Sequence, residues 1–359
     1  MTRFQWILAI GAGLASLLTA LGALPDANWG VVLVFGAAVA YSALRFIIAA
    51  PVWMDGALVA AEVIGVFSLL AAPSLALWSA LIATWLLAWL FIERLSRSIR
   101  AGAVPALGLL VPLVFGVTLL VLWEVMVRGF GVPDVFLPPP STIWGKLISS
   151  VPTLWKDFEQ TFIKGVLSGF ALGSIAGLVV AILVDRSPFL KRGLLPIGNF
   201  ASALPIVGIA PIMVMWFGYD WEGKAAVIVC VTFFPMLVNT VAGLNSAGRM
   251  EGDMMRTYAS TYWQRLLKLR LPAAMPFIFN ALKINSTLAL IAAIVAEFFG
   301  SPIVGMGFRI STGVGRLDID MVWAEVAVAA LAGSASYGLI ALIERAVTFW
   351  HPSVRGGRA

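Results

Sequence analysis

Long apolar segments constrain the fold of this chain more than any other feature. Ten such segments follow one another, and each approaches the roughly 20 residues that an α-helix needs to cross a bilayer. They lie near residues 4–24, 29–50, 54–72, 74–92, 104–127, 162–184, 194–217, 224–244, 273–299 and 321–346. Backbone polar groups in lipid must be satisfied within the spanning element, which favours helices. The sequence therefore predicts an all-α polytopic membrane protein with about ten transmembrane helices.

Composition narrows the chemistry that the chain can perform. Only 12% of the residues are charged, against about 25% in a soluble domain. The single cysteine, Cys230, and the single histidine, His351, lie far apart, so we expect neither a metal site nor a Cys/His nucleophile pair. The net charge of +6 is explained by basic loops at a membrane surface. We therefore expect a lipid bilayer and no nucleic acid as a partner, and no enzyme activity.

The distribution of Lys and Arg predicts the orientation of the spans. If the N-terminus lies in the cytoplasm, the inner segments hold 17 of the 24 basic residues and the outer segments hold 7. This asymmetry follows the positive-inside rule. An even number of spans then places both termini in the cytoplasm.

Two stretches outside the apolar segments carry local signals. Residues 128–161 contain the proline-rich bend Leu137-Pro138-Pro139-Pro140-Ser141, which cannot be helical. We expect Ser141 to cap a short amphipathic helix that follows this bend. The second stretch, residues 245–272, is the longest segment predicted to be cytoplasmic.

A basic run at residues 93–100 divides the chain. Four apolar segments precede it and six follow it. The sequence therefore predicts an added N-terminal transmembrane module at residues 1–102, of unknown role, and a functional core at residues 103–359.

The segment 245–272 reads as two short helices joined near Ala259 and Ser260, and Pro272 precedes the next span. A solvated amphipathic loop is the simplest interpretation. It does not explain the apolar side chains on a cytoplasmic connection, such as Met254 and Tyr258. A docking surface for a soluble partner does explain them.

This segment resembles the coupling loop, or EAA motif, of the membrane subunits of bacterial ATP-binding-cassette (ABC) importers. Alignment on Leu271-Pro272 places Asp253 at the acidic position, Met254 and Met255 at the two alanines, and Ala259 at the glycine. Alanine keeps the small size of glycine but lacks its freedom to adopt positive φ.

Further motifs are similar to the nitrate, sulfonate and taurine branch of that family, which also handles pyrimidines and riboflavin. They are Leu137 to Ser141, Ala203-Leu204-Pro205, Ala210-Pro211, Trp216-Phe217-Gly218, Ala296-Glu297-Phe298-Phe299-Gly300 and Gly305-Met306-Gly307. Together they cover about residues 104–350. Residues 1–102 carry no such resemblance.

The resemblance implies a type I ABC importer permease core with four extra N-terminal helices, in a bacterial cytoplasmic (inner) membrane. It implies import of a small polar or heterocyclic solute by alternating access. Expected partners are two copies of an ATPase subunit, a second permease copy in a homodimer, and an extracytoplasmic substrate-binding protein. This chain would bind no cofactor, and ATP and Mg would bind the ATPase. The residues expected to couple to the ATPase are Asp253, Met254, Met255, Arg256, Tyr258, Ala259, Ser260, Thr261 and Trp263.

Polar and flexible side chains within the spans are candidates for the substrate pathway. We single out Asn239, Asn285, Glu297 and Met215, because polar groups in lipid are costly and often functional. Hydrogen bonding between helices explains the amides equally well.

Glycines recur at every fourth position of the segment 162–184, at Gly165, Gly169, Gly173 and Gly177. Such a stripe lets two helices approach closely. It fits either packing within the chain or a dimer interface.

Two other interpretations fit the sequence less well. Residues 218–224 match the start of a phosphate-binding loop, but Ala225 follows where a hydroxyl is needed and no strand precedes it. A secondary transporter driven by an ion gradient is the alternative function. It typically shows internal repeats and carboxylates in its spans, and we find no repeat and no Asp in the middle of a core span.

Overall fold

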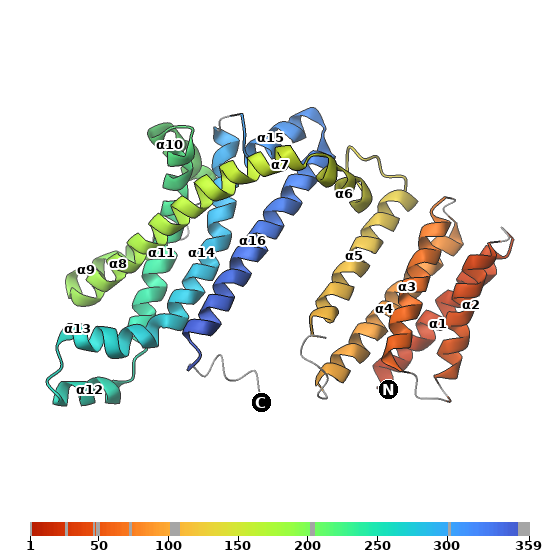
Figure 1. Cartoon of the computed structure of the whole chain (residues 1–359), viewed down its shortest axis with the longest axis horizontal. Helices are drawn as coiled ribbons and strands as arrows, with labels where there is room; N and C mark the ends of the chain where they lie inside the picture. The colour runs from red at the N-terminus through yellow and green to blue at the C-terminus, as the bar shows by residue number, and fades with distance from the viewer. Residues whose placement is uncertain are drawn as a thin grey trace. The chain divides into compact units, whose positions relative to one another are not determined.

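The computed structural model describes residues 2–25, 28–45, 47, 51–71, 74–100, 108–201, 205–300 and 303–350. These residues form helices, turns and loops, with no strand among them (Figure 1). The chain divides into two compact units, Met1–Trp144 and Gly145–Ala359. His351, the Ala203-Leu204 part of one motif and the predicted boundary at residue 102 lie outside the described residues.

The first unit is built around four packed helices and a fifth that joins them. Its helices are α1 (Arg3–Ala23), α2 (Trp29–Leu44), α3 (Val52–Leu69), α4 (Leu75–Arg100) and α5 (Leu110–Gly129). The helix α1 packs against α2 and α4, and α5 packs on α4. Small and branched side chains such as Ala15, Ala80 and Val66 fill the core between them. Thr2 and Gln5 form a capping box that begins α1.

The second unit surrounds the central helix α11, which packs against α8, α14 and α10. Its helices after the shared α6 (Pro140–Ser149) are α7 (Val151–Phe158), α8 (Leu167–Arg186), α9 (Pro188–Ala201), α10 (Ile206–Phe217), α11 (Trp221–Leu244), α12 (Arg249–Thr257), α13 (Tyr262–Arg265), α14 (Leu271–Phe299), α15 (Met306–Arg316) and α16 (Ile319–Val347). Within this unit, α12 and α13 lie at one end, and α10 and α15 lie at the opposite end (Figure 1).

Two π-helical segments join helices of the second unit into longer continuous helices. The segment η2 (Glu159–Val166) links α7 to α8, and η3 (Leu266–Arg270) links α13 to α14. The resulting continuous helices, Val151–Arg186 and Tyr262–Phe299, are 36 and 38 residues long. π-helical turns are rare and occur frequently at functional sites.

The predicted helices are largely present in the structure. Eight described helices are long and apolar enough to cross a membrane, and two shorter apolar helices, Trp29–Leu44 and Ile206–Phe217, complete a set of ten among the described residues. The predicted single span 194–217 is wrong, because α9 ends at Ala201 and α10 begins at Ile206. Pro205 precedes α10 with extended backbone angles (φ −70°, ψ 120°), and proline cannot donate the hydrogen bond that would continue a helix.

The helix after the proline-rich bend is present as α6, but its start differs from the prediction. It begins at Pro140 rather than after a cap at Ser141. The Ser141 backbone N–H instead donates to Glu124 Oε2 at 2.9 Å, and the Ser141 hydroxyl donates to Glu124 Oε1 at 2.7 Å. A carboxylate from α5 thus satisfies one of the free N–H groups at the start of α6.

Candidate functional site

The segment 245–272 forms a helical hairpin that projects from one end of the second unit. None of the residues of α12 is buried. Met254 and Tyr258 are 56% and 80% exposed, and Trp263 on α13 is 53% exposed. Apolar side chains exposed on a polar hairpin are typical of an interaction surface. The apolar residues of α12 are therefore not buried against any described part of this chain and are accessible to a partner.

The turn between the two hairpin helices is built on Ala259. Its φ is +52°, in the left-handed region that glycine adopts most readily. The Ser260 N–H donates to Met255 O at 3.1 Å, and the Ala259 N–H donates to Arg256 O at 2.9 Å. These two bonds form a Schellman motif, the common way of ending a helix. The turn keeps this geometry although alanine replaces the glycine of the family pattern.

The second hairpin helix begins with a capping box. The Thr261 hydroxyl accepts from the Gln264 N–H at 3.3 Å, and the Gln264 side chain accepts from the Thr261 N–H at 2.8 Å. Each of these groups would otherwise lack a partner at a helix start. The sequence Ala259-Ser260-Thr261 thus ends one helix and begins the next within three residues.

Arg270 fastens α13 and η3 to the rest of the second unit. Its Nη1 and Nη2 each lie 2.6 Å from a carboxylate oxygen of Asp185, and its Nε donates to Leu244 O at 2.9 Å. Tyr262 also donates to Asp185, at 3.0 Å. A bidentate Arg–carboxylate pair fixes orientation as well as distance. One side of the hairpin is therefore held firmly at the ends of α8 and α11.

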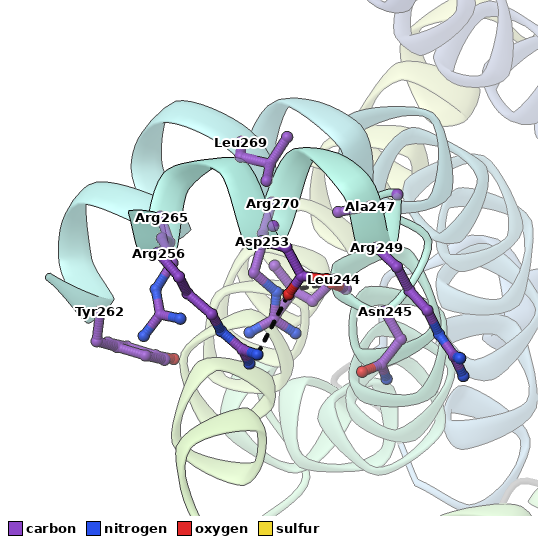
Figure 2. Close-up of a pocket in the computed structure, with 12 residues that line it drawn as sticks. Leu244, Asn245, Ala247, Arg249, Asp253, Arg256, Tyr262, Arg265, Leu269 and Arg270 are labelled. Atoms are coloured by element: carbon purple, nitrogen blue, oxygen red, sulfur yellow. Dashed lines mark hydrogen bonds and ion pairs between the residues drawn. The ribbon is translucent and has the colours of Figure 1, made fainter. Parts of the chain in front are cut away.

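A pocket of about 610 Å³ lies between α12 and the α13–η3 side of the hairpin. Figure 2 shows that the guanidinium groups of Arg256, Arg265 and Arg270 lie on the same side of the two helices. The residues that line the pocket are Leu244, Asn245, Ala247, Gly248, Arg249, Gly252, Asp253, Arg256, Tyr262, Arg265, Leu269 and Arg270. The pocket is strongly basic, because four arginines face a single carboxylate among these residues.

A buried ionic cluster lies towards the other end of the same unit. Glu297 Oε1 lies 2.8 Å from Lys224 Nζ, and the Thr161 hydroxyl donates to the same carboxylate at 2.9 Å. The Gly307 N–H donates to Glu297 Oε2 at 2.7 Å. All the charged side-chain atoms of this pair are almost fully buried. Together with Thr161 and Gly307, the pair connects four elements: η2, α11, α14 and α15.

The glycines of the Gly305-Met306-Gly307 motif are explained by this cluster. Gly305 has a φ of +140°, and its N–H donates to Asp157 Oδ1 at 2.7 Å. A Cβ at Gly307 would clash with the backbone carbonyl of Ile294. Both positions therefore require glycine.

Arg309 extends the cluster, with its Nε 2.8 Å from Asp157 Oδ2. This hydrogen bond raises the pKa of the Arg309 guanidinium above its usual value.

The four predicted pathway residues are not brought together by the structure. Asn285 is fully buried and donates to Ser174 Oγ at 3.1 Å and Thr232 O at 2.9 Å. Asn239 donates to the carbonyl of Pro235 in its own helix at 2.8 Å. No hydrogen bond or ion pair links Asn239, Asn285, Glu297 and Met215 to one another among the described residues. Their place on a substrate path stays a prediction.

The glycine stripe of α8 packs against α11 of the same chain. A Cβ at Gly169 would lie 2.6 Å from Ile228 Cβ, and one at Gly177 would lie 2.6 Å from the Phe233 carbonyl. A Cβ at Gly173 would clash with the side chain of Thr232. At Gly165 the nearest atoms lie 3.7 Å away. The stripe thus lets two helix backbones of one chain approach closely.

Sequence reasoning missed several buried charges. It placed Lys224 among the outer basic residues and in a rejected phosphate-loop match, and the structure shows it buried and paired with Glu297. In the first unit it missed Asp55, which pairs with Arg45 and Arg94. The available signal was the presence of ionisable residues in apolar helices, where a charge needs a partner.

Among the described residues, no group of three or more His, Cys, Asp or Glu side chains could hold a metal ion. The fold and the site thus define a polytopic helical membrane protein with a projecting two-helix loop. Residues 169–349 match the family described as binding-protein-dependent transport system inner membrane component. The chain belongs to this family of ABC importer permeases.

Curated relatives of the chain are bacterial permeases. The riboflavin transport system permease protein of Chloroflexus aurantiacus is 31% identical, over 72% of this chain and 95% of the relative. The formylaminopyrimidine transport permease protein of Halalkalibacterium halodurans is 30% identical, over 67% of this chain and 95% of the relative. A probable ABC transporter permease protein of Haemophilus influenzae is 31% identical, over 61% of this chain and 88% of the relative.

Family membership establishes the general role. The chain is a multi-pass inner-membrane permease of a binding-protein-dependent ABC importer for small solutes, and it is a non-catalytic transport component. Systems of this kind work with an ATPase and a substrate-binding protein. The predicted family and the predicted general role as an importer permease are therefore confirmed.

Proposed function

We propose that this chain imports a small polar or heterocyclic solute by alternating access, and that the 245–272 hairpin couples it to a separate ATPase. In this proposal both termini and the hairpin lie in the cytoplasm. A second copy of the chain completes the pathway, two ATPase subunits dock below, and a binding protein delivers the solute from outside. ATP and Mg bind the ATPase, and this chain binds no cofactor.

The exposed apolar surface of α12 is the observation that carries the proposal. Met254 projects from a helix with no buried residue, and Tyr258 is exposed directly after that helix ends. The neighbouring η3 is instead fastened to Asp185 through Arg270. A surface that is exposed on one side and rigidly attached on the other can transmit force from a partner. The proposed contact set is Asp253, Met254, Met255, Arg256, Tyr258, Ala259, Ser260, Thr261 and Trp263.

The proposed substrate class rests on the named relatives. Two of them are named as permeases for riboflavin and formylaminopyrimidine. Others are named for taurine and bicarbonate. The heterocycle permeases are 31% and 30% identical over 72% and 67% of this chain, and the aliphatic sulfonates and taurine permeases are 29% and 28% identical over 69% and 66%. Selectivity would reside mainly in the binding protein, so binding-protein ligands should be screened first among nitrogen heterocycles.

Charge insertion in α12 tests the coupling proposal. We expect Met254→Asp or Tyr258→Asp to abolish co-purification of the ATPase subunit from detergent-solubilised native membranes, because an unpaired charge would enter an apolar contact. Phe136→Asp is the matched control, since Phe136 is 78% exposed but lies outside the hairpin. Unchanged co-purification of the ATPase with both α12 variants would refute the proposal.

A further inference from the structure

The basic pocket inside the hairpin has a charge pattern that docking of α12 does not explain. Arg249, Arg256, Arg265 and Arg270 line it. Asp253 forms an ion pair with Arg256, and Asp185 forms one with Arg270. The Glu251 carboxylate lies beside Gly248, which lines the pocket. The four arginines and these three carboxylates therefore leave an excess of one positive charge.

Two of the four arginines have no anionic partner. Among the described residues, the guanidinium groups of Arg249 and Arg265 make no hydrogen bond and no ion pair. The Arg265 Nε is buried and unsatisfied. A buried donor without an acceptor costs about 1–3 kcal/mol, and more when it is charged. Such a donor at a pocket is available to bind an anion.

The remaining donors converge from separate elements. Arg270 uses three N–H groups on Asp185 and Leu244 O, which leaves one free N–H on each Nη. The only ion pair of Arg256 among the described residues is Asp253 at 3.4 Å, with both side chains at least 70% exposed, and pairs of this kind contribute little. Figure 2 shows the Arg256, Arg265 and Arg270 groups facing one space. Forked donors that converge in this way match the oxygens of a phosphate.

The neighbouring side chains reinforce the positive potential. Lys191 on α9 donates to Asn245 Oδ1 at 3.1 Å, and Asn245 lines the pocket. The Arg186 guanidinium lies 5.7 Å from the centre of the Tyr262 ring. The pocket also lies where α8 and α11 end and α14 begins, which is the depth at which spanning helices meet lipid headgroups.

We infer that this arginine pocket binds a phosphate group between the two helices of the hairpin, through Arg256, Arg265 and Arg270. The phosphate comes either from an anionic phospholipid headgroup or from a soluble phosphate. The bound phosphate connects α12 to the α13–η3 segment, which Arg270 holds in place. The pocket shares Asp253 and Arg256 with the contact set proposed for the ATPase, but phosphate binding can be measured on the chain alone.

The test uses the full chain in nanodiscs and two probes. In phosphatidylcholine nanodiscs, binding of inorganic phosphate is titrated by calorimetry. In nanodiscs that mix phosphatidylglycerol and phosphatidylcholine, native mass spectrometry counts the lipid molecules retained on the chain. Binding in the first assay indicates a soluble phosphate, and selective retention of phosphatidylglycerol indicates a lipid.

The variants are Arg265→Gln and Arg256→Gln, and Arg192→Gln is the control. Arg256 is largely exposed, so its substitution leaves the fold intact even if Arg265→Gln does not. Arg192 is exposed on α9 and does not line the pocket. We expect each pocket variant to weaken binding of the active probe about tenfold, which equals about 1.4 kcal/mol, and the control to leave it unchanged.

Three results would overturn the inference. The first is that neither probe binds the chain. The second is that Arg192→Gln weakens binding as much as the pocket variants do. The third is that the pocket variants bind both probes normally but lose the ATPase subunit, which would assign the pocket to an acidic surface of that partner.

Discussion

Ala259 holds a backbone conformation that suits glycine better than alanine. Its φ of +52° closes the Schellman turn between α12 and α13. A residue with a Cβ loses roughly 1–2 kcal/mol in the left-handed region. The hairpin therefore retains a local strain that the family's usual glycine would remove.

Replacement of this alanine should stabilise the turn. We expect Ala259→Gly to slow trypsin cleavage at Arg256 and Arg265, because relief of about 1 kcal/mol of strain lowers the population of open hairpins severalfold. Ala273→Gly is the control, since Ala273 lies inside α14, where glycine costs about 1 kcal/mol relative to alanine. Faster cleavage in Ala259→Gly than in the unaltered chain would show that the turn carries no strain.

The buried pair of Lys224 and Glu297 should be a major source of stability. We expect Glu297→Gln to lower the apparent melting temperature strongly, because removal of one partner leaves a buried charge unpaired at a cost of about 3–5 kcal/mol. Thermal unfolding in detergent, followed by tryptophan fluorescence, measures the effect.

Glu159→Gln is the matched control for that substitution. Glu159 pairs with Lys164, and both side chains are about half exposed, so the loss should be below about 1 kcal/mol. Unchanged stability of Glu297→Gln combined with lost uptake would instead support the predicted pathway role of Glu297.

At the residue scale, local patterns were predictable and long-range pairs were not. The acidic residue, the paired methionines and the turn alanine of the hairpin could be located from the spacing to Leu271-Pro272. The partner of Glu297 lies 73 residues away on another helix. No period or motif in one sequence links two such positions, because the contact depends on how helices pack.

At the element scale, the close approach of α8 and α11 depends on glycines. At Gly177 an added Cβ would lie 2.6 Å from the Phe233 carbonyl and 2.8 Å from Met236 Cβ. A backbone carbonyl cannot move aside as a side chain can. The two helices would have to separate to admit a methyl group.

One methyl group on this stripe should therefore be measurable. We expect Gly177→Ala to destabilise the protein by about 1–3 kcal/mol through overpacking. Gly116→Ala in α5 is the matched control, because nothing lies within 4 Å of the added Cβ and alanine is the better helix former. Equal thermal stability of the two variants would contradict the packing shown here.

The helices themselves were predictable from apolar runs, but the break at Pro205 was not. Pro211, Pro235 and Pro276 all lie inside helices, whereas the chain is extended at Pro205. Neighbouring helices in a membrane protein can compensate for the hydrogen bond that a proline removes. A proline therefore does not by itself decide whether a span continues.

At the scale of the whole molecule, the orientation stays a prediction that labelling can test. Cys230 is the only cysteine, so Cys230→Ala supplies a background without thiols. On that background we expect a membrane-impermeant maleimide to label Ser149→Cys on intact cells, and to label Thr257→Cys only after the membrane is opened. Both positions are exposed, and the reverse pattern would invert the proposed topology.

The division of the chain also stays partly a prediction. The basic run at residues 93–100 suggested a boundary near residue 102, and the family match covers residues 169–349. In the structure, α5 packs on α4 and belongs to the first compact unit. Composition marks where charge changes, whereas compact units follow helix contacts, and the two need not coincide.

The continuous helix Tyr262–Phe299 has a mechanical consequence. Its 38 residues change direction between α13 and α14 (Figure 1), and the 29 residues of α14 alone span about 44 Å. Arg270 holds the chain just before α14, and Glu297 joins the ionic cluster at the far end of α14. The hairpin and the distant cluster are therefore attached to one and the same helix.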